Sequence, residues 1–228
     1  MREATGIIPA RYGATRFPGK PLAIIAGKSL IQRVYEQALK AKNLKKLIIA
    51  TDDERIFAAA QAFGANVRMT SPDHQAGTER VAEVAEGLET PIIINIQGDE
   101  PLLQGQMIDD LVQALQDSTI SMATLASKVT DVNRIHDQDI VKVVTDKNGK
   151  ALYFSRSPLP FGPADYFYQH IGIYGYQKEF LMKFCILPVS RLEAYEGLEQ
   201  LRALENGYMI TIVPTLFQTL SVDTPQDI

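Results

Sequence analysis

Short apolar runs of strand length alternate with helix-like segments through the first half of the chain. Several of the runs are continuously apolar, as in strands buried on both faces of a sheet. They occupy residues 6–10, 47–51, 65–69, 91–96 and 120–126. The helix-like segments occupy residues 29–42, 53–63, 78–88 and 105–116. This alternation predicts an α/β fold, Rossmann-like, with a mixed, mostly parallel sheet covered by helices on both faces.

Two of these helices carry start signals. Ser29, with Gln32 three residues later, has the pattern of a capping box, in which each side chain bonds the backbone of the other residue. Asp52 precedes the segment 53–63 and is a candidate N-cap. An apolar stripe at helical spacing supports the first helix and comprises Ile31, Val34, Tyr35 and Ala38.

The pattern changes after about residue 126. Residues 141–156 predict a β-hairpin around Lys147-Asn148-Gly149, and residues 169–177 predict another strand. Residues 191–206 predict one acidic amphipathic helix, and two more β runs follow it. With no repeat or linker in 228 residues, we expect one domain over residues 1–228. The part from about 130 to 190 is a candidate β-rich subdomain for dimer contact, inserted in that fold.

Composition excludes several classes of protein. The formal net charge is −4, whereas broad nucleic-acid binding usually needs a basic face. No run of about 18 apolar residues predicts a membrane helix, and the N-terminal apolar run is too short for a secretory signal. Cys185 stands alone, so no disulfide can form within the chain. We therefore predict a soluble cytoplasmic protein that binds neither nucleic acid nor membrane.

Three cations lie on the loop that follows the first predicted strand. Arg11, Arg16 and Lys20 are set among glycines and prolines, which exclude a helix. The loop fits neither the Walker A pattern nor GxGxxG. In open α/β sheets, ligands bind beyond the carboxyl ends of the strands, where two guanidiniums and an ammonium can hold a triphosphate. The alternative, three solvated surface charges, stays open at this point.

Two aspartates follow other β runs. Asp99 lies in NIQGDEPLL (95–103), directly after an apolar strand, and Asp223 lies in SVDTPQD (221–227). Carboxylates suit Mg²⁺, which takes oxygen ligands and bridges phosphates. Taken singly, Asp99 can equally be a turn residue beside a glycine, and Asp223 a helix cap before a proline.

Seven motifs together resemble one family. In chain order they are PARYGATRFPGKPL, DHQAGTER, NIQGDEP, KALYFSR, HIGIYGY, LEQLRALE and VDTP, spanning about residues 6 to 227. This set resembles the 3-deoxy-manno-octulosonate cytidylyltransferases, or CMP-Kdo synthetases. The resemblance implies a homodimeric enzyme in which CTP and the acid sugar Kdo give CMP-Kdo and diphosphate for lipopolysaccharide biosynthesis, with Mg²⁺ as cofactor.

The resemblance also implies residue roles. Arg11, Lys20, Asp99 and Asp223 are the expected catalytic residues, and the two aspartates are the expected metal ligands. The residues expected at the nucleotide are Arg11, Arg16, Lys20, Ala76, Gly77 and Arg80. Those expected at the sugar acid are Gln97, Arg156, His170, Tyr174, Glu199 and Gln200.

Some of these residues have simpler readings. A lone His170 is more often structural, Tyr174 fits a core strand, and Arg156 fits a surface cation. Alanine stands at positions 14 and 76, where the family commonly has serine. Backbone N–H groups can make the contacts that a serine hydroxyl would make there.

Other functions remain as alternatives. The acceptor can be 8-amino-Kdo or another ulosonic acid. A sialic-acid enzyme and a sugar-1-phosphate nucleotidyltransferase are disfavoured by the opening loop. An alternative of another class is a non-catalytic nucleotide-binding module, against which the presence of Arg11, Lys20, Asp99 and Asp223 counts.

Overall fold

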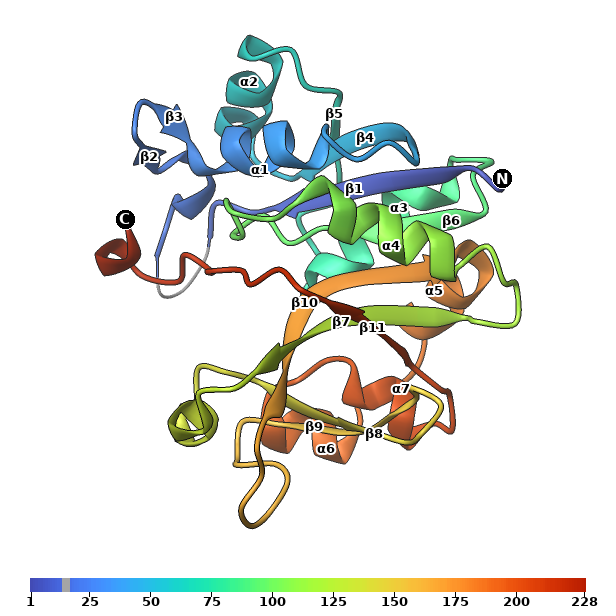
Figure 1. Ribbon diagram of the computed structural model, residues 1–228. Helices are drawn as coiled ribbons and strands as arrows, with labels where there is room; N and C mark the ends of the chain where they lie inside the picture. Colours follow the sequence, from blue (N-terminus) through green and yellow to red (C-terminus); the bar gives the residue numbers. More distant parts are fainter. Residues whose placement is uncertain (14–16) are drawn as a thin grey trace.

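The computed structural model describes residues 1–13 and 17–228, and one large sheet organises them (Figure 1). Seven strands follow the order β11-β7-β10-β6-β1-β4-β5, and a hairpin, β8 and β9, joins through β10. The strands are β1 (Ala4–Ala10), β4 (Leu44–Thr51), β5 (Val67–Met69), β6 (Ile92–Asn95), β7 (Met122–Val129), β8 (Lys142–Thr145), β9 (Ala151–Ser155), β10 (Phe167–Gln177) and β11 (Thr211–Thr215).

Strand directions confirm the mixed, mostly parallel sheet. β1 runs parallel to β4 and β6, β4 to β5, and β11 to β7. β10 is antiparallel to both β6 and β7, so it alone opposes the other six strands of the seven-strand order. The chain adds strands first on one side of β1 and then on the other, which makes β1 and β6 the switch point of the sheet.

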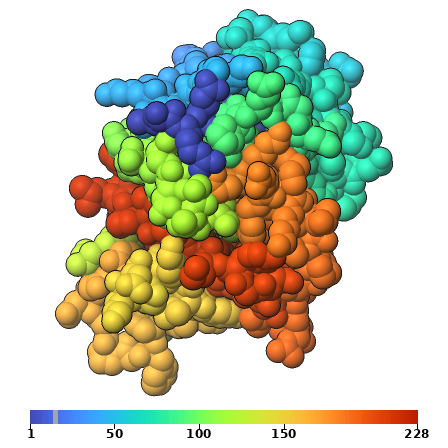
Figure 2. Space-filling model, turned by 90° about the vertical axis from the view of Figure 1, so that its right-hand side faces the viewer, coloured from blue at the N-terminus to red at the C-terminus, as the bar shows by residue number. Residues whose placement is uncertain are grey.

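The predicted hairpin is part of this same sheet. β8 pairs with β9 and, at Tyr168 and Gln169, with β10. Its turn is held by Asp146, whose Oδ1 accepts from the backbone N–H groups of Asn148 and Lys150, each at 2.8 Å. In Figure 2 the hairpin, in yellow, lies against the orange and red segments that carry β10 and the last helices. Its proposed part in a dimer stays a prediction.

Seven α-helices occur in the described residues. They are α1 (Leu30–Ala38), α2 (Glu54–Ala62), α3 (Gly77–Glu86), α4 (Gly105–Ala114), α5 (Lys178–Cys185), α6 (Arg191–Glu196) and α7 (Leu201–Glu205). Short elements complete this part of the chain: the two-residue strands β2 (Ile24–Ile25) and β3 (Lys28–Ser29), and the 3-10 helices η1 (Lys20–Leu22), η2 (Val132–His136) and η3 (Pro225–Asp227). Of the helices described, none combines the length and the apolar character that crossing a membrane needs.

The central strands are buried on both faces, as their continuous apolar runs predict. Ile7 packs into the core that contains α3 and α5, whereas its neighbour Ile8 packs into the core that contains α1 and α4. Ile48 and Ile49 divide in the same way. Successive strand residues point to opposite faces, so a sheet with two helical layers needs apolar residues at every position.

The caps of α1 and α2 differ in detail from the prediction. Ser29 caps α1, accepting from the Gln32 backbone at 3.4 Å, but the Gln32 side chain bonds Glu36, so the capping box is half formed. The cap of α2 is Asp53, which accepts from the backbone N–H groups of residues 55 and 56; Asp52 is instead an ion-pair partner. In both cases a neighbouring polar side chain competes for the predicted capping group: Glu36 bonds Gln32, and Arg80 bonds Asp52.

The predicted helix 191–206 is wrong as one element. Gly197 ends α6 in the left-handed conformation, with φ of 64°, and α7 begins four residues later. Glu193 reaches across this break to Arg202 at 2.8 and 2.5 Å. Of the two β runs predicted to end the chain, one is β11, the last strand in the described part, and the other is wrong, because residues 216–224 are irregular.

Candidate active site

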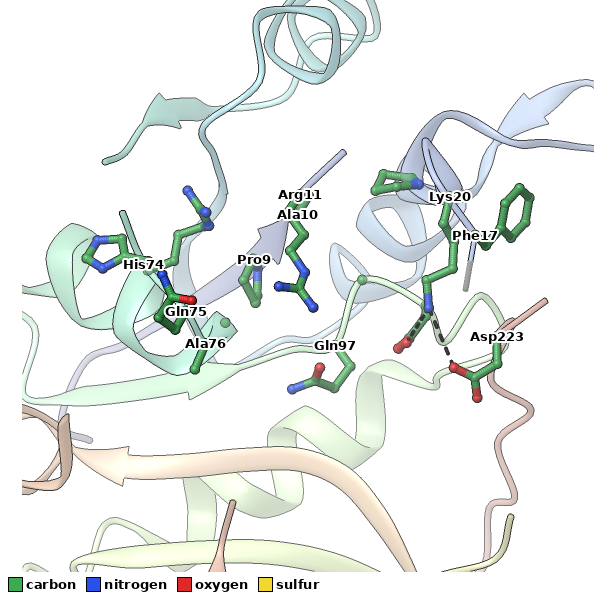
Figure 3. A pocket seen from close by; sticks show the side chains of 15 residues that line it. Pro9, Ala10, Arg11, Phe17, Lys20, His74, Gln75, Ala76, Gln97 and Asp223 are labelled. Carbon is green, nitrogen blue, oxygen red and sulfur yellow. Dashed lines mark hydrogen bonds and ion pairs between the residues drawn. The ribbon is translucent and has the colours of Figure 1, made fainter. Parts of the chain in front are cut away.

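A cleft of about 360 Å³ lies beyond the carboxyl ends of β1 and β6, at the switch point of the sheet (Figure 3). Its walls come from four separate parts of the chain: the loop after β1, the start of α3, the loop after β6 and the C-terminal segment. They are formed by Pro9, Ala10, Arg11, Phe17, Lys20, Pro21, His74, Gln75, Ala76, Gly77, Arg80, Gln97, Gly98, Asp99 and Asp223.

Two glycines let these walls approach the end of β1. A Cβ at Gly98 would lie 3.0 Å from the Pro9 carbonyl oxygen, and a Cβ at Gly77 would lie 3.3 Å from Pro9 Cγ. A third, Gly19, has φ of 74° and donates its N–H to the Tyr12 carbonyl at 2.8 Å. The turn at Gly19 returns the opening loop to the cleft, where Lys20 begins η1.

Lys20 lies between the two aspartates that the sequence singled out. Its Nζ is 2.8 Å from Asp99 Oδ2 and 3.8 Å from Asp223 Oδ1 (Figure 3). The backbone brings the two aspartates together, since Val222 donates its N–H to the Asp99 carbonyl at 2.9 Å. Asp223 also accepts from Ser221 Oγ at 3.1 Å. Two carboxylates from distant parts of the chain thus share one cation.

A third carboxyl group, Glu100, lies beneath them. Glu100 is 6% exposed and its Oε2 has no hydrogen-bond partner among the described residues. Burial, helped by the negative charges of Asp99 and Asp223, raises the pKa of Glu100 to about 7, against a hydrogen bond with Thr219 that lowers it. This end of the cleft therefore concentrates negative charge and favours bound cations.

The other predicted catalytic residue, Arg11, belongs to the same cleft. Figure 3 shows its guanidinium and the Gln97 amide directed into one space. The structure thus brings together Arg11, Lys20, Gln97, Asp99 and Asp223, which come from three different loops. Arg16 lies outside the described residues.

The start of α3 forms the opposite wall. Ala76, the N-cap of this helix, lines the cleft together with Gly77 and provides no side-chain cap. Arg80 also lines the cleft, but it is 3% exposed and donates to Asp52 at 3.0 Å, to Thr70 and to the Ser71 carbonyl. Arg80 therefore holds the wall together, and its expected contact with the nucleotide stays a prediction.

Two of the residues predicted for the sugar acid, His170 and Tyr174, lie on β10. The Gln97 Cγ would be 3.6 Å from a Cβ at Gly172, so this side chain packs over β10. The rings of His170 and Tyr174 are 5.4 Å apart. Burial of its ring lowers the pKa of His170 to about 3, and Nε2 bonds Thr124 Oγ1 at 3.0 Å, so His170 is a neutral, positioned group.

Glu199 and Gln200 lie in the turn between α6 and α7. Glu199 Oε2 accepts from Thr78 Oγ1 at 2.6 Å, and burial raises the pKa of Glu199. Gln200 is 3% exposed, and its Nε2 has no partner among the described side chains and backbone. Arg156 stands apart: it is exposed at the end of β9 and donates to the Gln138 carbonyl at 2.8 Å.

Sequence reasoning missed three residues here. Glu100 follows Asp99 directly, and its place after a buried strand was a usable signal. Asn95, the polar end of an apolar run, is fully buried on β6. Thr78 bonds a residue 121 positions away, which no local pattern reveals.

A divalent metal fits this arrangement only in part. Among the residues that the structure describes, no group of three or more His, Cys, Asp or Glu side chains is placed to hold a metal ion. Asp99 and Asp223 do both face one cation, the Lys20 ammonium. Two carboxylates with phosphate oxygens completing the shell are a common way of holding Mg²⁺, so the donor set fits a metal that arrives with a nucleotide.

The cleft and the sheet are those of a nucleotidyltransferase, and a family model described as cytidylyltransferase matches residues 5–212. The chain therefore belongs to the cytidylyltransferase family, in the branch of the 3-deoxy-manno-octulosonate cytidylyltransferases. It is 52% identical over 232 residues to the enzyme of that name from Solibacter usitatus, covering 100% of this chain and 92% of the relative. The Geobacter sulfurreducens enzyme is 46% identical over 239 residues, covering 98% and 96%.

Solved structures agree. A CMP:2-keto-3-deoxy-manno-octonic acid synthetase in complex with CTP superposes with a TM-score of 0.93 and 41% identity, covering 98% of this chain and 94% of that one. A cytidylyltransferase from Leptospira borgpetersenii, at 17% identity and a TM-score of 0.66, shares the fold.

Proposed function

We propose that this nucleotidyltransferase transfers CMP from CTP to 3-deoxy-D-manno-octulosonate, giving CMP-Kdo and diphosphate for lipopolysaccharide biosynthesis. In this reaction the anomeric hydroxyl of the sugar acid loses its proton and its oxygen bonds the α-phosphorus. The bond from that phosphorus to the β-phosphate oxygen breaks, and diphosphate leaves. No covalent intermediate with the protein is needed, so the protein acts by positioning and electrostatics.

The observation that carries this proposal is the meeting of Lys20, Asp99 and Asp223 beside Arg11. A triphosphate brings several negative charges, and Arg11 and Lys20 supply the positive charges on one side of the cleft. As diphosphate leaves, negative charge grows on its oxygens, and the same two cations stabilise it. Asp99 and Asp223 hold Lys20 in place until the nucleotide enters.

Mg²⁺ belongs to the proposal, with Asp99 and Asp223 as its protein ligands. When bound, the ion supplies further positive charge at the phosphate oxygens. Lys20 then turns from the carboxylates to the phosphates, within the reach of its flexible side chain. The two aspartates thus bind a cation in both states: the Lys20 ammonium before the nucleotide enters, and Mg²⁺ afterwards.

The sugar acid is proposed to lie beyond Gln97, against β10 and the turn that carries Glu199 and Gln200. This space adjoins the cleft, because Gly77 of the cleft wall precedes Thr78, which bonds Glu199. Neutral His170 and the phenol of Tyr174 are hydrogen-bonding groups that suit hydroxyls. Burial, with the charge of Glu199 second, raises the pKa of Tyr174, so this phenol keeps its proton.

The test is diphosphate release by purified protein with CTP, Kdo and MgCl₂, with and without EDTA. Release that needs all three supports the proposal. ATP and UTP test the base, and sialic acid and 8-amino-Kdo test the acceptor. Turnover with the amino sugar but not with Kdo would keep the mechanism and change the substrate. CTP binding without turnover on any sugar acid would favour the non-catalytic nucleotide-binding module.

A matched pair of variants tests the residue assignment. Asp99→Asn keeps the size of the side chain and removes its charge, and we expect turnover to fall at least about 10²-fold. Asp139→Asn, an exposed aspartate outside the cleft lining, is the control and should turn over as the wild type does. Full activity of Asp99→Asn at every Mg²⁺ concentration would contradict the assignment.

A further inference from the structure

Thr78 stands at the centre of a buried polar network that joins four elements. It is the second residue of α3 and is 3% exposed. Its hydroxyl lies 2.6 Å from Glu199 Oε2, in the turn before α7, and 3.3 Å from Asn95 Nδ2, on β6. The Tyr176 phenol, on β10, also bonds it. One hydroxyl therefore connects the helix that lines the nucleotide cleft with the turn that carries Glu199.

The directions of these hydrogen bonds follow from the chemistry of the groups. The amide nitrogen of Asn95 can only donate, so it occupies a lone pair of the Thr78 oxygen. An ionised Glu199 carboxylate can only accept, so it takes the Thr78 proton. Asn95 thus turns the Thr78 O–H toward Glu199. Hydrogen bonds to a charged acceptor are stronger and more directional than neutral ones.

Two buried polar atoms at or beside this network are unpaired. Asn95 Oδ1 and Gln200 Nε2 have no partner within the described part of the protein, although Asn95 is fully buried and Gln200 is 3% exposed. Buried polar atoms without partners are rare and costly, so they indicate a polar group that binds there. Glu199 and Gln200 are neighbours, and together they offer an acceptor and a donor. That combination matches a hydroxyl group.

The network adjoins the cleft on the acceptor side. Gly77, immediately before Thr78, lines the cleft, and the Tyr174 phenol feels the charges of both Glu199 and Glu100. Tyr174 also lies directly opposite Asn95 in the pairing of β10 with β6. A ligand that reaches from the nucleotide toward β10 therefore meets Glu199 and Gln200 next.

We propose that Thr78 is a positioning residue, whose hydroxyl holds the Glu199 carboxylate in the orientation in which Glu199 and Gln200 bind a hydroxyl of the acceptor sugar. This inference rests on the proposed function, because the hydroxyl belongs to the sugar acid. Thr78 itself does not touch the substrate. Its loss should weaken binding of the acceptor and leave the nucleotide contacts, which come from other residues, unchanged.

The experiment compares steady-state kinetics of three variants with the wild type. Thr78→Val keeps the shape and removes the hydroxyl, and we expect KM for Kdo to rise about 10- to 100-fold, the range for a lost hydrogen bond to a charged group. KM for CTP should stay within about twofold. Thr78→Ser restores the hydroxyl and should return KM for Kdo to within a few-fold of the wild type.

The chain offers a matched control in Thr90, which is 5% exposed and shares a buried hydrogen bond with Thr5 at 2.9 Å. Thr90→Val removes a buried hydroxyl far from the network and should change stability but neither KM. If Thr78→Val and Thr90→Val alter the kinetics alike, or if Thr78→Val leaves KM for Kdo unchanged, the positioning role is overturned. Failure of Thr78→Ser to rescue would also overturn it.

The wild-type measurement separates this inference from the function on which it rests. If the wild type releases diphosphate with CTP and Kdo and the KM of Thr78→Val for Kdo is unchanged, only this inference is overturned. If the wild type is active only with another sugar acid, the KM values of the wild type and of Thr78→Val are compared for that acceptor instead. A folded wild type that is silent with every sugar acid overturns both.

Discussion

Lys20 Nζ lies 2.8 Å from Asp99 Oδ2, although 79 positions separate the two residues in the chain. Both side chains are largely shielded from solvent, with exposed fractions of 16% and 27%. The ion pair fills the part of the cleft where a metal and a triphosphate are proposed to bind. Nucleotide binding must therefore replace this contact with contacts to phosphate and metal.

Removal of the Lys20 charge tests this exchange. In Lys20→Met, the carboxylates of Asp99 and Asp223 face each other, and the buried Glu100 lies beside them. We expect turnover to fall at least about 10²-fold, because charge on the leaving diphosphate loses a stabilising cation. The melting temperature without metal should fall, and Mg²⁺ should raise it more than in the wild type.

The control for this change is Lys28→Met, which breaks the exposed ion pair with Glu36. Exposed pairs contribute little, so neither turnover nor the response to Mg²⁺ should move. Thermal melts over a series of MgCl₂ concentrations measure both variants. If Mg²⁺ raises the melting temperatures of Lys20→Met and of the wild type equally, the Lys20 ammonium and Mg²⁺ do not compete for the site between Asp99 and Asp223.

Glu100 gives the stability of the metal-free protein a pH dependence. Its pKa is about 7 in the folded state, mainly through burial, against an ordinary value of 4.5. Between these values the folded protein holds a proton that the unfolded chain releases, so this contribution to stability is present below about pH 4.5 and is lost as pH rises through 7.

Glu100→Gln removes that titration. In EDTA, we expect the variant to gain stability relative to the wild type between pH 5 and pH 8, by on the order of 1–3 kcal/mol at the higher pH. Urea denaturation at the two pH values measures it, with the exposed Glu89→Gln as control. If the difference in free energy of unfolding between Glu100→Gln and the wild type is the same at both pH values, Glu100 does not titrate in this range and the prediction is wrong.

Ala76 leaves α3 without a side-chain cap, and a serine there should supply one. Glu79 already reaches back to the backbone of residues 75 and 76, at 2.8 and 3.4 Å. Ala76→Ser should complete a capping box and raise the free energy of unfolding by about 1 kcal/mol. Ser29→Ala, which removes the cap of α1, should lower it by a similar amount. Chemical denaturation of both variants checks the opposite signs.

Gly197 makes the break that presents Glu199 and Gln200. Its φ of 64° is unfavourable for a residue with a Cβ, so Gly197→Ala should lower the free energy of unfolding by about 1–2 kcal/mol. Gly87→Ala is the control, because Gly87 has φ of −80° and a Cβ there makes only ordinary contact. Denaturation curves that shift equally for both variants would contradict the argument from backbone conformation.

Local pattern was enough for most of the sheet and its helices. The apolar runs became β1, β4, β5, β6 and β7. The helical segments became α1 to α4, of which α1, α2 and α4 are shorter than predicted and α3 begins one residue earlier. These predictions succeeded because burial on one or two faces imposes a period on the residues themselves. The place of Asp99 at the end of a strand was predictable for the same reason.

Local pattern failed where a distant group decided the outcome. Leu198, Leu201 and Leu204 fit one helix, but Gly197 ends it and the Glu193–Arg202 ion pair stabilises the bend. Asp53 rather than Asp52 caps α2, because Arg80 of α3 engages Asp52. A single sequence carries no record of such competition between neighbours in space.

The sequence by itself determined the α/β class, the strands and helices of the first half, and the kinds of residue available for chemistry. Only the tertiary structure decided which of them meet. Lys20 joins Asp99 and Asp223, and Thr78 joins Asn95 and Glu199, across the switch point of the sheet. The physical reason is that periodicity reports burial within one element, whereas a site is made by loops whose nearness depends on how all the strands pair.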